Sequence, residues 1–305
     1  MKKCTFIFTL LISAFLLIFN YASINADDIN GNTENEYFPI KESKIETWPS
    51  SITWFDEKFP QPTIFRGAAK SWKILELTYK HIAQNYPDPK FKFGVDIDED
   101  EKFANCFPDS EESEIDGFFD EKPEGWPLSF SDFWQQVQKG DIKRFYGEIV
   151  LNKEDDINYI PHHLTKYLLK ILESEKSMPE IFQEATKTTI FVSGPGSVRL
   201  THSHESVILV QLEGKKIMTF IPPDQAGLLY VKHCKHGKDY KVNDKSCVSP
   251  VNVRNPDHEK FPEFKNAQLY QVVIEPGDII FIPEGWFHDV RALENSISLS
   301  FFYKD

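Results

Sequence analysis

The fold of this chain is decided by the stretch Pro276–His288, which reads PGDIIFIPEGWFH. A Pro-Gly-Asp turn precedes four apolar residues, and a proline with a glycine close behind ends them, which is typical of a buried strand between two turns. His288 closes the stretch shortly after the second turn. The pattern therefore places an imidazole at the mouth of a β-barrel, where it is a candidate metal ligand.

Two further histidines lie upstream in the segment Thr201–Glu205, THSHE. His202 and His204 stand at positions i and i+2, so in an extended segment both side chains point to the same face and can reach one ion. Together with His288 they offer three imidazoles, a set that suits zinc, copper, nickel or iron. The alternative is that each histidine is a surface or half-buried side chain with no ligand role.

The first 26 of the 305 residues have the pattern of a secretory signal peptide. Lys2 and Lys3 precede the apolar run Cys4–Phe19, and the small residue Ala26 stands before an acidic sequence, so we expect cleavage after Ala26. The alternative is an uncleaved anchor, because the run approaches the roughly 18 residues that cross a bilayer. No later segment has this character, and we expect a protein that is secreted or lies in the lumen of the secretory pathway, without membrane contact after cleavage.

The composition of the remaining chain limits its partners. Residues 27–305 carry 32 basic and 47 acidic side chains, a net charge of −15 with neutral histidine. That charge repels phosphate backbones and argues against binding of nucleic acid. Cys106, Cys234 and Cys247 are too few for a disulfide-framed scaffold. Cys234 and Cys247 flank a polar loop that a disulfide could close in an oxidising lumen, which would leave Cys106 over.

The pattern of the chain changes near residue 188. Residues 27–42 are polar and acidic and predict a flexible leader before a single domain over residues 43–305. Helical patterns recur within residues 43–187, where we expect a helical wrap, and short apolar runs between Gly and Pro turns predict a β-barrel core over residues 188–305. Helices followed by strands favour a mainly β fold with flanking helices, either a barrel or a double-sheet jelly roll.

The strand patterns also predict which side chains fill the barrel core. On the last strand, the hydroxyl residues Ser296, Ser298 and Ser300 alternate with apolar residues and would leave room for a ligand if they faced inward. This assignment competes with the apolar core, because neighbouring strand residues face opposite sides. The expected apolar core is Ile208, Val210, Leu212, Phe220, Ile280, Ile282, Leu299 and Phe301.

Several short blocks follow one another in a fixed order. They are Phe59–Ala68 (FPQPTIFRGA) with Trp72, Gly194–Ser197 (GPGS), Gln211–Lys216 (QLEGKK), Ile221–Pro223 (IPP), Asn255–Asp257 (NPD), Phe261–Phe264 (FPEF) and Pro276–His288. Across about residues 50–305 the chain resembles JmjC-domain, cupin-like proteins in these blocks. Within that family it looks most like the small hydroxylase branch.

The resemblance implies a double-stranded β-helix, and active members of the family are Fe(II)- and 2-oxoglutarate-dependent oxygenases. They hold iron with a His-x-Asp/Glu pair and a distal His. By this resemblance, His202 is the first ligand, His288 is the distal ligand, and Lys216 pairs with the far carboxylate of 2-oxoglutarate. Tyr146 resembles a tyrosine that touches the same carboxylate in some members, and a packing role is the alternative.

The neighbours of Lys216 bear on the same question. Lys216 shares a strand face with Met218 and Phe220, which are apolar. A lysine on that face has reason to point inward only if an anion meets it there. The alternative is a solvated lysine at the start of a strand.

The chain departs from the family pattern at the acid. His204 stands where Asp or Glu is expected, and the segment up to Gly214 is one residue shorter than usual. Glu205 could replace the acid only if the strand slipped or bulged, because it otherwise faces away. Arg199 and Ser300 also replace a threonine and an asparagine of some hydroxylases. A lumenal branch of the JmjC family has His-x-His at this place, and three imidazoles can still bind iron or zinc.

Three functions fit this sequence. The first is an oxygenase that hydroxylates a protein side chain in the secretory pathway, favoured by Lys216 and His288. The second is a JmjC fold without catalysis that binds partners or acts as a chaperone-like factor, favoured by the missing acid. The third is a zinc-binding cupin, because the segment from Gly196 through the histidine pair to Gly214 resembles cupins without their glutamate.

Overall fold

The computed structural model describes residues 36–85, 93–95, 129–142, 145–151, 167, 170–171, 178–231 and 247–303. The expected signal peptide, most of the expected leader, the acidic stretch near residue 100, Cys106 and Cys234 lie outside these residues. Residues Asn35–Asp305 form one compact unit. Within the described ranges, no helix combines the length and the apolar character needed to cross a bilayer.

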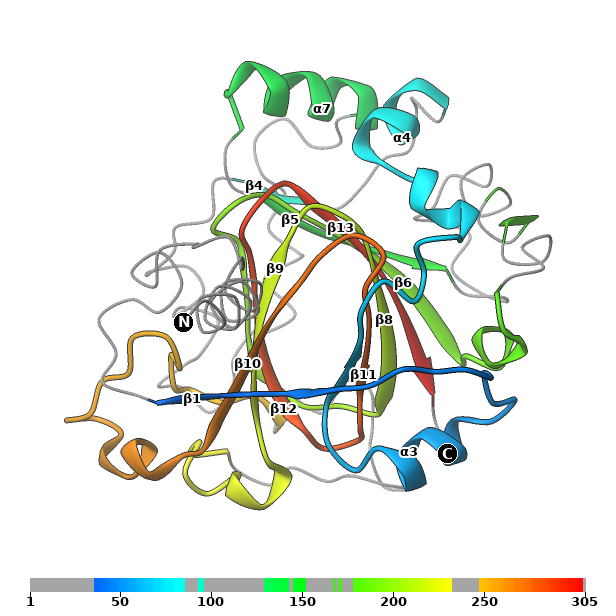
Figure 1. Ribbon diagram of the computed structural model, residues 1–305. Helices are drawn as coiled ribbons and strands as arrows, with labels where there is room; N and C mark the ends of the chain where they lie inside the picture. The colour runs from blue at the N-terminus through cyan, green and yellow to red at the C-terminus, as the bar shows by residue number, and fades with distance from the viewer. Residues whose placement is uncertain are drawn as a thin grey trace, which may run out of the picture. The chain divides into compact units, whose positions relative to one another are not determined.

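The unit is built on two β-sheets whose strands interleave along the chain (Figure 1). The larger sheet has the order β2 (Lys41–Glu42), β3 (Thr63–Phe65), β11 (Ile279–Ile282), β8 (Ser206–Glu213), β13 (Ser296–Tyr303), β6 (Lys187–Ser193), β5 (Phe145–Leu151) and β4 (Phe93–Val95). The smaller sheet has the order β1 (Tyr37–Pro39), β10 (Leu269–Ile274), β9 (Lys216–Ile221), β12 (Phe287–Ala292) and β7 (Val198–His202).

Successive strands from β6 to β13 alternate between the two sheets, except that β9 and β10 pair within the smaller sheet. β8 and β9 follow each other across Gly214 but lie in different sheets, and β11 and β12 do the same across the second turn of the Pro276–His288 stretch. Gly214 makes its crossing tight, because its φ of +65° favours glycine and an added Cβ would lie 2.1 Å from the Asn295 carbonyl oxygen. This alternation is that of a jelly roll, so the predicted fold class is confirmed.

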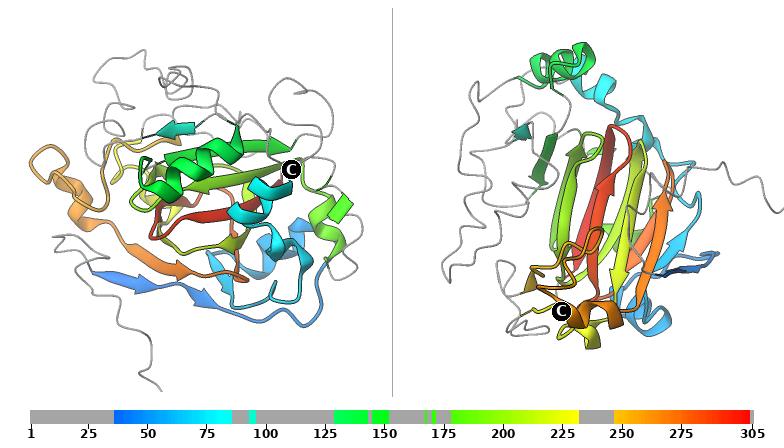
Figure 2. Two further views of the ribbon diagram at one scale, coloured as in Figure 1. Left: turned by 90° about the horizontal axis from the view of Figure 1, so that it is seen from above. Right: turned by 90° about the vertical axis from the view of Figure 1, so that its left-hand side faces the viewer.

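Among the described residues, three α-helices flank the sheets: α3 (Ile52–Lys58), α4 (Tyr79–Asn85) and α7 (Phe130–Lys139). Ser51 and Ser129 cap α3 and α7 by accepting a backbone N–H of the first turn, and Gly140 ends α7 in the left-handed region. Helices α4 and α7 lie side by side at one end of the strands (Figure 2). The described part of the chain also contains the 3₁₀ turns η1 (Lys73–Glu76), η2 (Glu180–Gln183), η3 (Pro223–Gln225) and η6 (Pro262–Asn266).

The larger sheet is buried on both faces. Ile208, Val210, Leu212, Leu299 and Phe301 pack in one cluster with helix residues of α3, α4 and α7. Phe220, Ile280 and Ile282 pack in a second cluster on the barrel side, where strands of the two sheets meet. The predicted apolar core is therefore confirmed as buried, but only the second group lines the barrel interior. The three serines of β13 are buried as well, on the face opposite Leu299 and Phe301.

The segment boundaries differ from the sequence-based expectation at the N-terminal side. Residues 37–39 and 41–42 form strands β1 and β2 where a flexible leader was expected, and β4 and β5 lie within the expected helical wrap. The edge strands have two or three residues each, which is too short for a hydrophobic alternation to be visible. β1 and β2 also pair in parallel with distant strands, so their conformation depends on tertiary contacts.

Candidate metal centre

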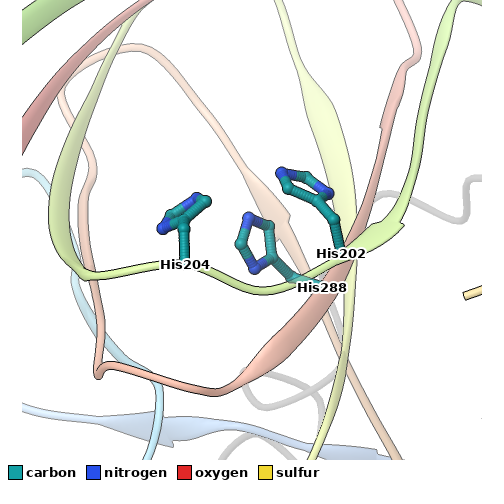
Figure 3. A group of neighbouring side chains, drawn as sticks. All are labelled: His202, His204 and His288. Carbon is teal, nitrogen blue, oxygen red and sulfur yellow. The ribbon is translucent and has the colours of Figure 1, made fainter. Parts of the chain in front are cut away.

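Three histidine side chains converge where the two sheets meet (Figure 3). His202 is the last residue of β7, His288 lies directly opposite it on β12, and His204 follows in the connection to β8. One ring nitrogen of each residue lies within 4.8 Å of those of the other two. Ring centroids are 4.3 Å apart for His202 and His288, and 4.7 Å apart for His204 and His288. The predicted cluster therefore forms, although His204 lies in a loop and not in a strand.

Backbone carbonyls select the tautomer of two of these rings. The Nδ1 atom of His204 lies 2.7 Å from the Glu205 carbonyl oxygen, and that of His288 lies 3.1 Å from the Trp286 carbonyl oxygen. A carbonyl oxygen only accepts, so in both rings Nδ1 carries the proton and Nε2 keeps its lone pair. A backbone acceptor behind a metal-binding imidazole is the usual way of orienting it.

The turn before His288 is fastened to the loop that carries His204. Gly285, at φ +82°, donates its N–H to the His204 carbonyl oxygen at 3.0 Å. Glu284 donates its N–H to the Ser206 hydroxyl at 3.0 Å, and that hydroxyl donates to Asp56 at 2.7 Å. The positions of His204 and His288 are thus coupled through the backbone, which explains why the glycine and the turn precede the histidine.

The two carboxylates next to the histidines in sequence do not join the cluster. Glu205 is buried, but its carboxylate is not among the converging ligand atoms of the described residues. Asp289 lies on the opposite face of β12, where its Oδ1 atom is 3.5 Å from the Arg254 Nε atom. Burial raises the pKa of the Asp289 carboxyl. The candidate ligand set is therefore three imidazoles, which fits Fe(II) or Zn²⁺ but brings no negative charge to the ion.

Lys216 lies inside the barrel, only 3% exposed. Within the described part of the chain, no carboxylate lies within ion-pair distance of it, and burial lowers the pKa of Lys216 to about 7. It shares a strand face with Met218 and Phe220, and Phe220 lies opposite His288. Lys216 is four residues from Phe220, so its backbone lies roughly 13 Å along the strand from the histidine level.

Polar side chains line the barrel wall at the Lys216 end. Ser298 donates to the Gln211 side-chain oxygen at 2.7 Å, and Gln211 donates to the Gly214 carbonyl oxygen at 2.9 Å, two residues before Lys216. Tyr146 on β5 is buried and lies opposite Ser193 on β6, and its ring centroid is 6.2 Å from that of Phe191. Tyr146 thus lies on the wall near this end.

Thr189 and Gln211 are wall residues that sequence analysis did not single out. Thr189 lies opposite Ser300, and its hydroxyl oxygen is buried without a hydrogen-bond partner among the described residues. The spacing of Thr189 and Gln211 could have revealed them. Each stands two residues from another inward-facing position of an apolar strand, so its side chain points to the same face. Ser300 is buried on the same face as Thr189, so the middle of the barrel carries two hydroxyl groups.

Comparison with known proteins identifies the family. Residues 58–305 match the model of the cupin-like domain. The chain belongs to the cupin-like family. It is 31% identical over 137 residues to human tRNA wybutosine-synthesizing protein 5, covering 44% of this chain and 40% of the relative. It is 27% identical over 169 residues to lysine-specific demethylase 8 of Xenopus tropicalis, covering 53% and 36%.

A longer alignment joins this cupin-like chain to HSPB1-associated protein 1 of Rattus norvegicus, 23% identical over 250 residues. It covers 77% of this chain and 46% of the relative. The alignments therefore span less than half the length of these three relatives. The relatives are of JmjC type, in agreement with the resemblance found in the sequence blocks.

Proposed function

We propose that this cupin-like protein is an Fe(II)- and 2-oxoglutarate-dependent oxygenase of the JmjC type that hydroxylates a protein side chain in the secretory pathway. The observation that carries the proposal is the presence of two features in one interior: three converging imidazoles, and a buried lysine with no carboxylate within ion-pair distance among the described residues. A metal-binding cupin alone has no use for the lysine. A diacid that chelates a metal with one end requires a cation at the other end.

Each residue has a defined task in this proposal. His202, His204 and His288 would hold the ion and leave its remaining positions open. Lys216 would bind the far carboxylate, with Tyr146 and Thr189 as neighbouring hydroxyl donors on the wall. Iron(II), when bound, supplies the redox chemistry with oxygen. The protein itself orients the diacid between the two ends and keeps water out with Phe220 and Phe302, whose rings lie 6.2 Å from His288 and 5.1 Å from His204.

A location in the secretory pathway is supported by two observations. The first 26 residues have the signal-peptide pattern. Cys247 is disulfide-bonded, and disulfides persist mainly in oxidising compartments. The names of the relatives point to RNA in one case and to lysine in another, so the fold alone does not select the substrate. The acidic composition favours a protein over a nucleic acid.

The experiment is a calorimetric titration of 2-oxoglutarate into the iron-loaded protein without oxygen, followed by detection of succinate in air. We expect a dissociation constant for 2-oxoglutarate in the micromolar to low millimolar range. We also expect succinate to form in air without a protein substrate. The matched variants are Lys216→Met and Lys215→Met, because Lys215 pairs with Glu275 at the surface at 2.9 Å. Only Lys216→Met should lose the binding of 2-oxoglutarate. An iron-loaded protein that does not bind the diacid at millimolar concentration would overturn the proposal.

The second candidate is a JmjC fold without catalysis that serves as a binding or chaperone-like module. The observation that favours it is the missing acid: His204 replaces the carboxylate, and neither Glu205 nor Asp289 takes its place. This candidate predicts metal binding without succinate formation. Capture of a partner by the metal-loaded protein and by His288→Ala to the same extent would support it.

A further inference from the structure

Helix α3 is connected to the histidine cluster by two hydrogen bonds that meet at one hydroxyl group. The Asp56 carboxylate on α3 accepts the Ser206 hydroxyl at 2.7 Å, and the oxygen of that hydroxyl accepts the Glu284 N–H at 3.0 Å. Ser206 begins β8 two residues after His204, and Glu284 lies in the turn that leads to His288. One hydroxyl therefore joins the helix to both segments that carry these two histidines.

The orientation of the Ser206 hydroxyl depends on Asp56. A serine hydroxyl has one proton and a carboxylate only accepts, so Ser206 donates to Asp56 and turns a lone pair to the Glu284 N–H. Hydrogen bonds to a charged acceptor are stronger than neutral ones, and linked hydrogen bonds strengthen one another. Without the carboxylate the hydroxyl is free to rotate, and the Glu284 N–H loses an acceptor of fixed direction.

Helix α3 is itself packed against the strand that leads into this turn. Ser51 caps the helix, and Phe55, next to Asp56 in the sequence, is fully buried. The ring centroid of Phe55 lies 5.1 Å from that of Phe281 on β11. The packing of Phe55 thus gives Asp56 a fixed position opposite Ser206.

We propose that Asp56 is a positioning residue of the three-histidine site: through Ser206 it fixes the turn before His288 against the loop that carries His204. The inference rests on the metal site of the proposed function. Asp56 precedes residues 58–305, which match the cupin-like domain, so the family match does not include it. The helix in front of the matched domain is therefore part of the support of the metal site.

The expected effect on metal affinity is moderate, because the turn keeps a second attachment. Gly285 donates its N–H to the His204 carbonyl oxygen at 3.0 Å, and this bond joins backbone atoms only. Loss of a group that orients a metal ligand costs about 10- to 100-fold in metal affinity in known sites. Asp56 acts one hydrogen bond further from the ligands, so we expect a loss at the lower end of that range, about tenfold.

The test measures the dissociation constant of Zn²⁺, a redox-inert probe, by calorimetry with a competing chelator. Asp56→Ala and Ser206→Ala should each raise this constant about tenfold. Ser206→Ala leaves the charge of the protein unchanged, so it separates the hydrogen bonds from the attraction between Asp56 and the ion. Because both residues act through one chain of hydrogen bonds, the double variant should lose no more affinity than either single variant.

Two further variants of α3 separate the hydrogen bond from the charge. Asp56→Asn removes the charge but keeps an oxygen that accepts from Ser206, so it should retain most of the Zn²⁺ affinity. Glu57→Ala is the control, because Glu57 is exposed on the same helix and its loss changes the net charge equally. It should keep the affinity of the unchanged protein. Losses in both variants as large as in Asp56→Ala would show that charge sets the affinity, and would overturn the inference.

Amide hydrogen exchange of the metal-free proteins gives a second readout. The Glu284 amide, which donates to Ser206, should exchange faster in Asp56→Ala, by more than the loss of global stability in urea unfolding explains. Glu57→Ala should leave this exchange unchanged. Unchanged Zn²⁺ affinity in Asp56→Ala, additive losses in the double variant, or unchanged Glu284 exchange would each overturn the inference.

The proposed function and this inference fail in different ways. If the unchanged protein binds neither Zn²⁺ nor Fe(II), the proposed function fails. Exchange of the Glu284 amide then decides the positioning role of Asp56: faster exchange in Asp56→Ala supports it, and unchanged exchange overturns it.

Discussion

The two ends of the barrel interior are built in opposite ways. At the histidine end, the Nδ1 atoms of His204 and His288 lie at backbone carbonyls, so the polar groups are satisfied and the lone pairs point to one place. At the lysine end, Lys216 is buried without a carboxylate among the described residues. The first end offers ligands to an ion, and the second offers a buried cation to an anion. This difference is the reason for proposing a diacid that reaches from one end to the other.

The largest expected effect is at the histidine end. His288→Ala should abolish metal binding, with a loss of at least about 100-fold, because two remaining imidazoles hold a divalent ion poorly. Metal content after gel filtration is the measurement. His258→Ala is the control, because His258 is exposed and lies outside the cluster. Equal metal content in both variants would show that the three imidazoles are not the site.

The second-largest expected effect is at the lysine end and leaves the histidine end unchanged. Lys216→Met should reduce 2-oxoglutarate affinity at least about 100-fold, because removing one partner of a buried charge pair costs about 3–5 kcal/mol. Metal content should stay the same. Stability of the ligand-free protein should not fall, because a buried cation without a partner is destabilising. Calorimetry and urea unfolding measure the two quantities, and a variant that also loses its metal would contradict the independence of the two ends.

The pH dependence of stability is a further test of the buried lysine end. The pKa of Lys216 is about 7 in the folded protein, below its ordinary value of 10.5. Between these values the unfolded chain binds more protons, so stability of the ligand-free protein should rise with pH, by up to about 1.4 kcal/mol per pH unit. Below pH 7 Lys216 is protonated in both states and the burial penalty is complete.

Ligand binding should have the opposite pH dependence. A carboxylate favours the ammonium form, so 2-oxoglutarate affinity should fall as the pH rises above about 7. Urea unfolding and calorimetry from pH 6.5 to 9.5 give both curves, and Lys216→Met should flatten both. A ligand affinity that is independent of pH in the unchanged protein would mean that the diacid does not meet this lysine.

Much of this site was readable in the sequence, for physical reasons that differ between its parts. The turns around Ile279–Ile282 and the i, i+2 spacing of His202 and His204 are local signals, and they predicted the strands and the histidine cluster. The sequence did not show which side chains of β13 point into the barrel. The larger sheet is covered on both faces, so the apolar and the hydroxyl residues of this strand are both buried. Strands β1 and β2 were missed because their pairing is with distant chain segments.

The pairing of Cys247–Ser249 with β7 also left no trace in the sequence. The segment has three residues, and its hydrogen bonds to Thr201 and Ser203 join backbone atoms that every residue type provides. Only the cysteine pattern drew attention to this part of the chain. Long-range contacts of this kind depend on the fold as a whole, so they appear only once the two sheets are assembled.

The smallest expected effect lies between the two ends, at Thr189. Its hydroxyl is buried without a partner among the described residues, and an unsatisfied buried hydroxyl costs about 1–3 kcal/mol. Thr189→Val should therefore raise the free energy of unfolding of the ligand-free protein by about 1 kcal/mol.

Thr219→Val is the matched control for this prediction. The Thr219 hydroxyl on β9 accepts from the Gln271 side chain at 3.3 Å, so the same change there removes a hydrogen bond and should lower stability. If the diacid accepts from Thr189, then Thr189→Val should also weaken 2-oxoglutarate binding while it stabilises the free protein. Urea unfolding with and without the diacid separates the two effects. Destabilisation of the free protein by both variants would mean that the Thr189 hydroxyl already has a partner and is not reserved for a ligand.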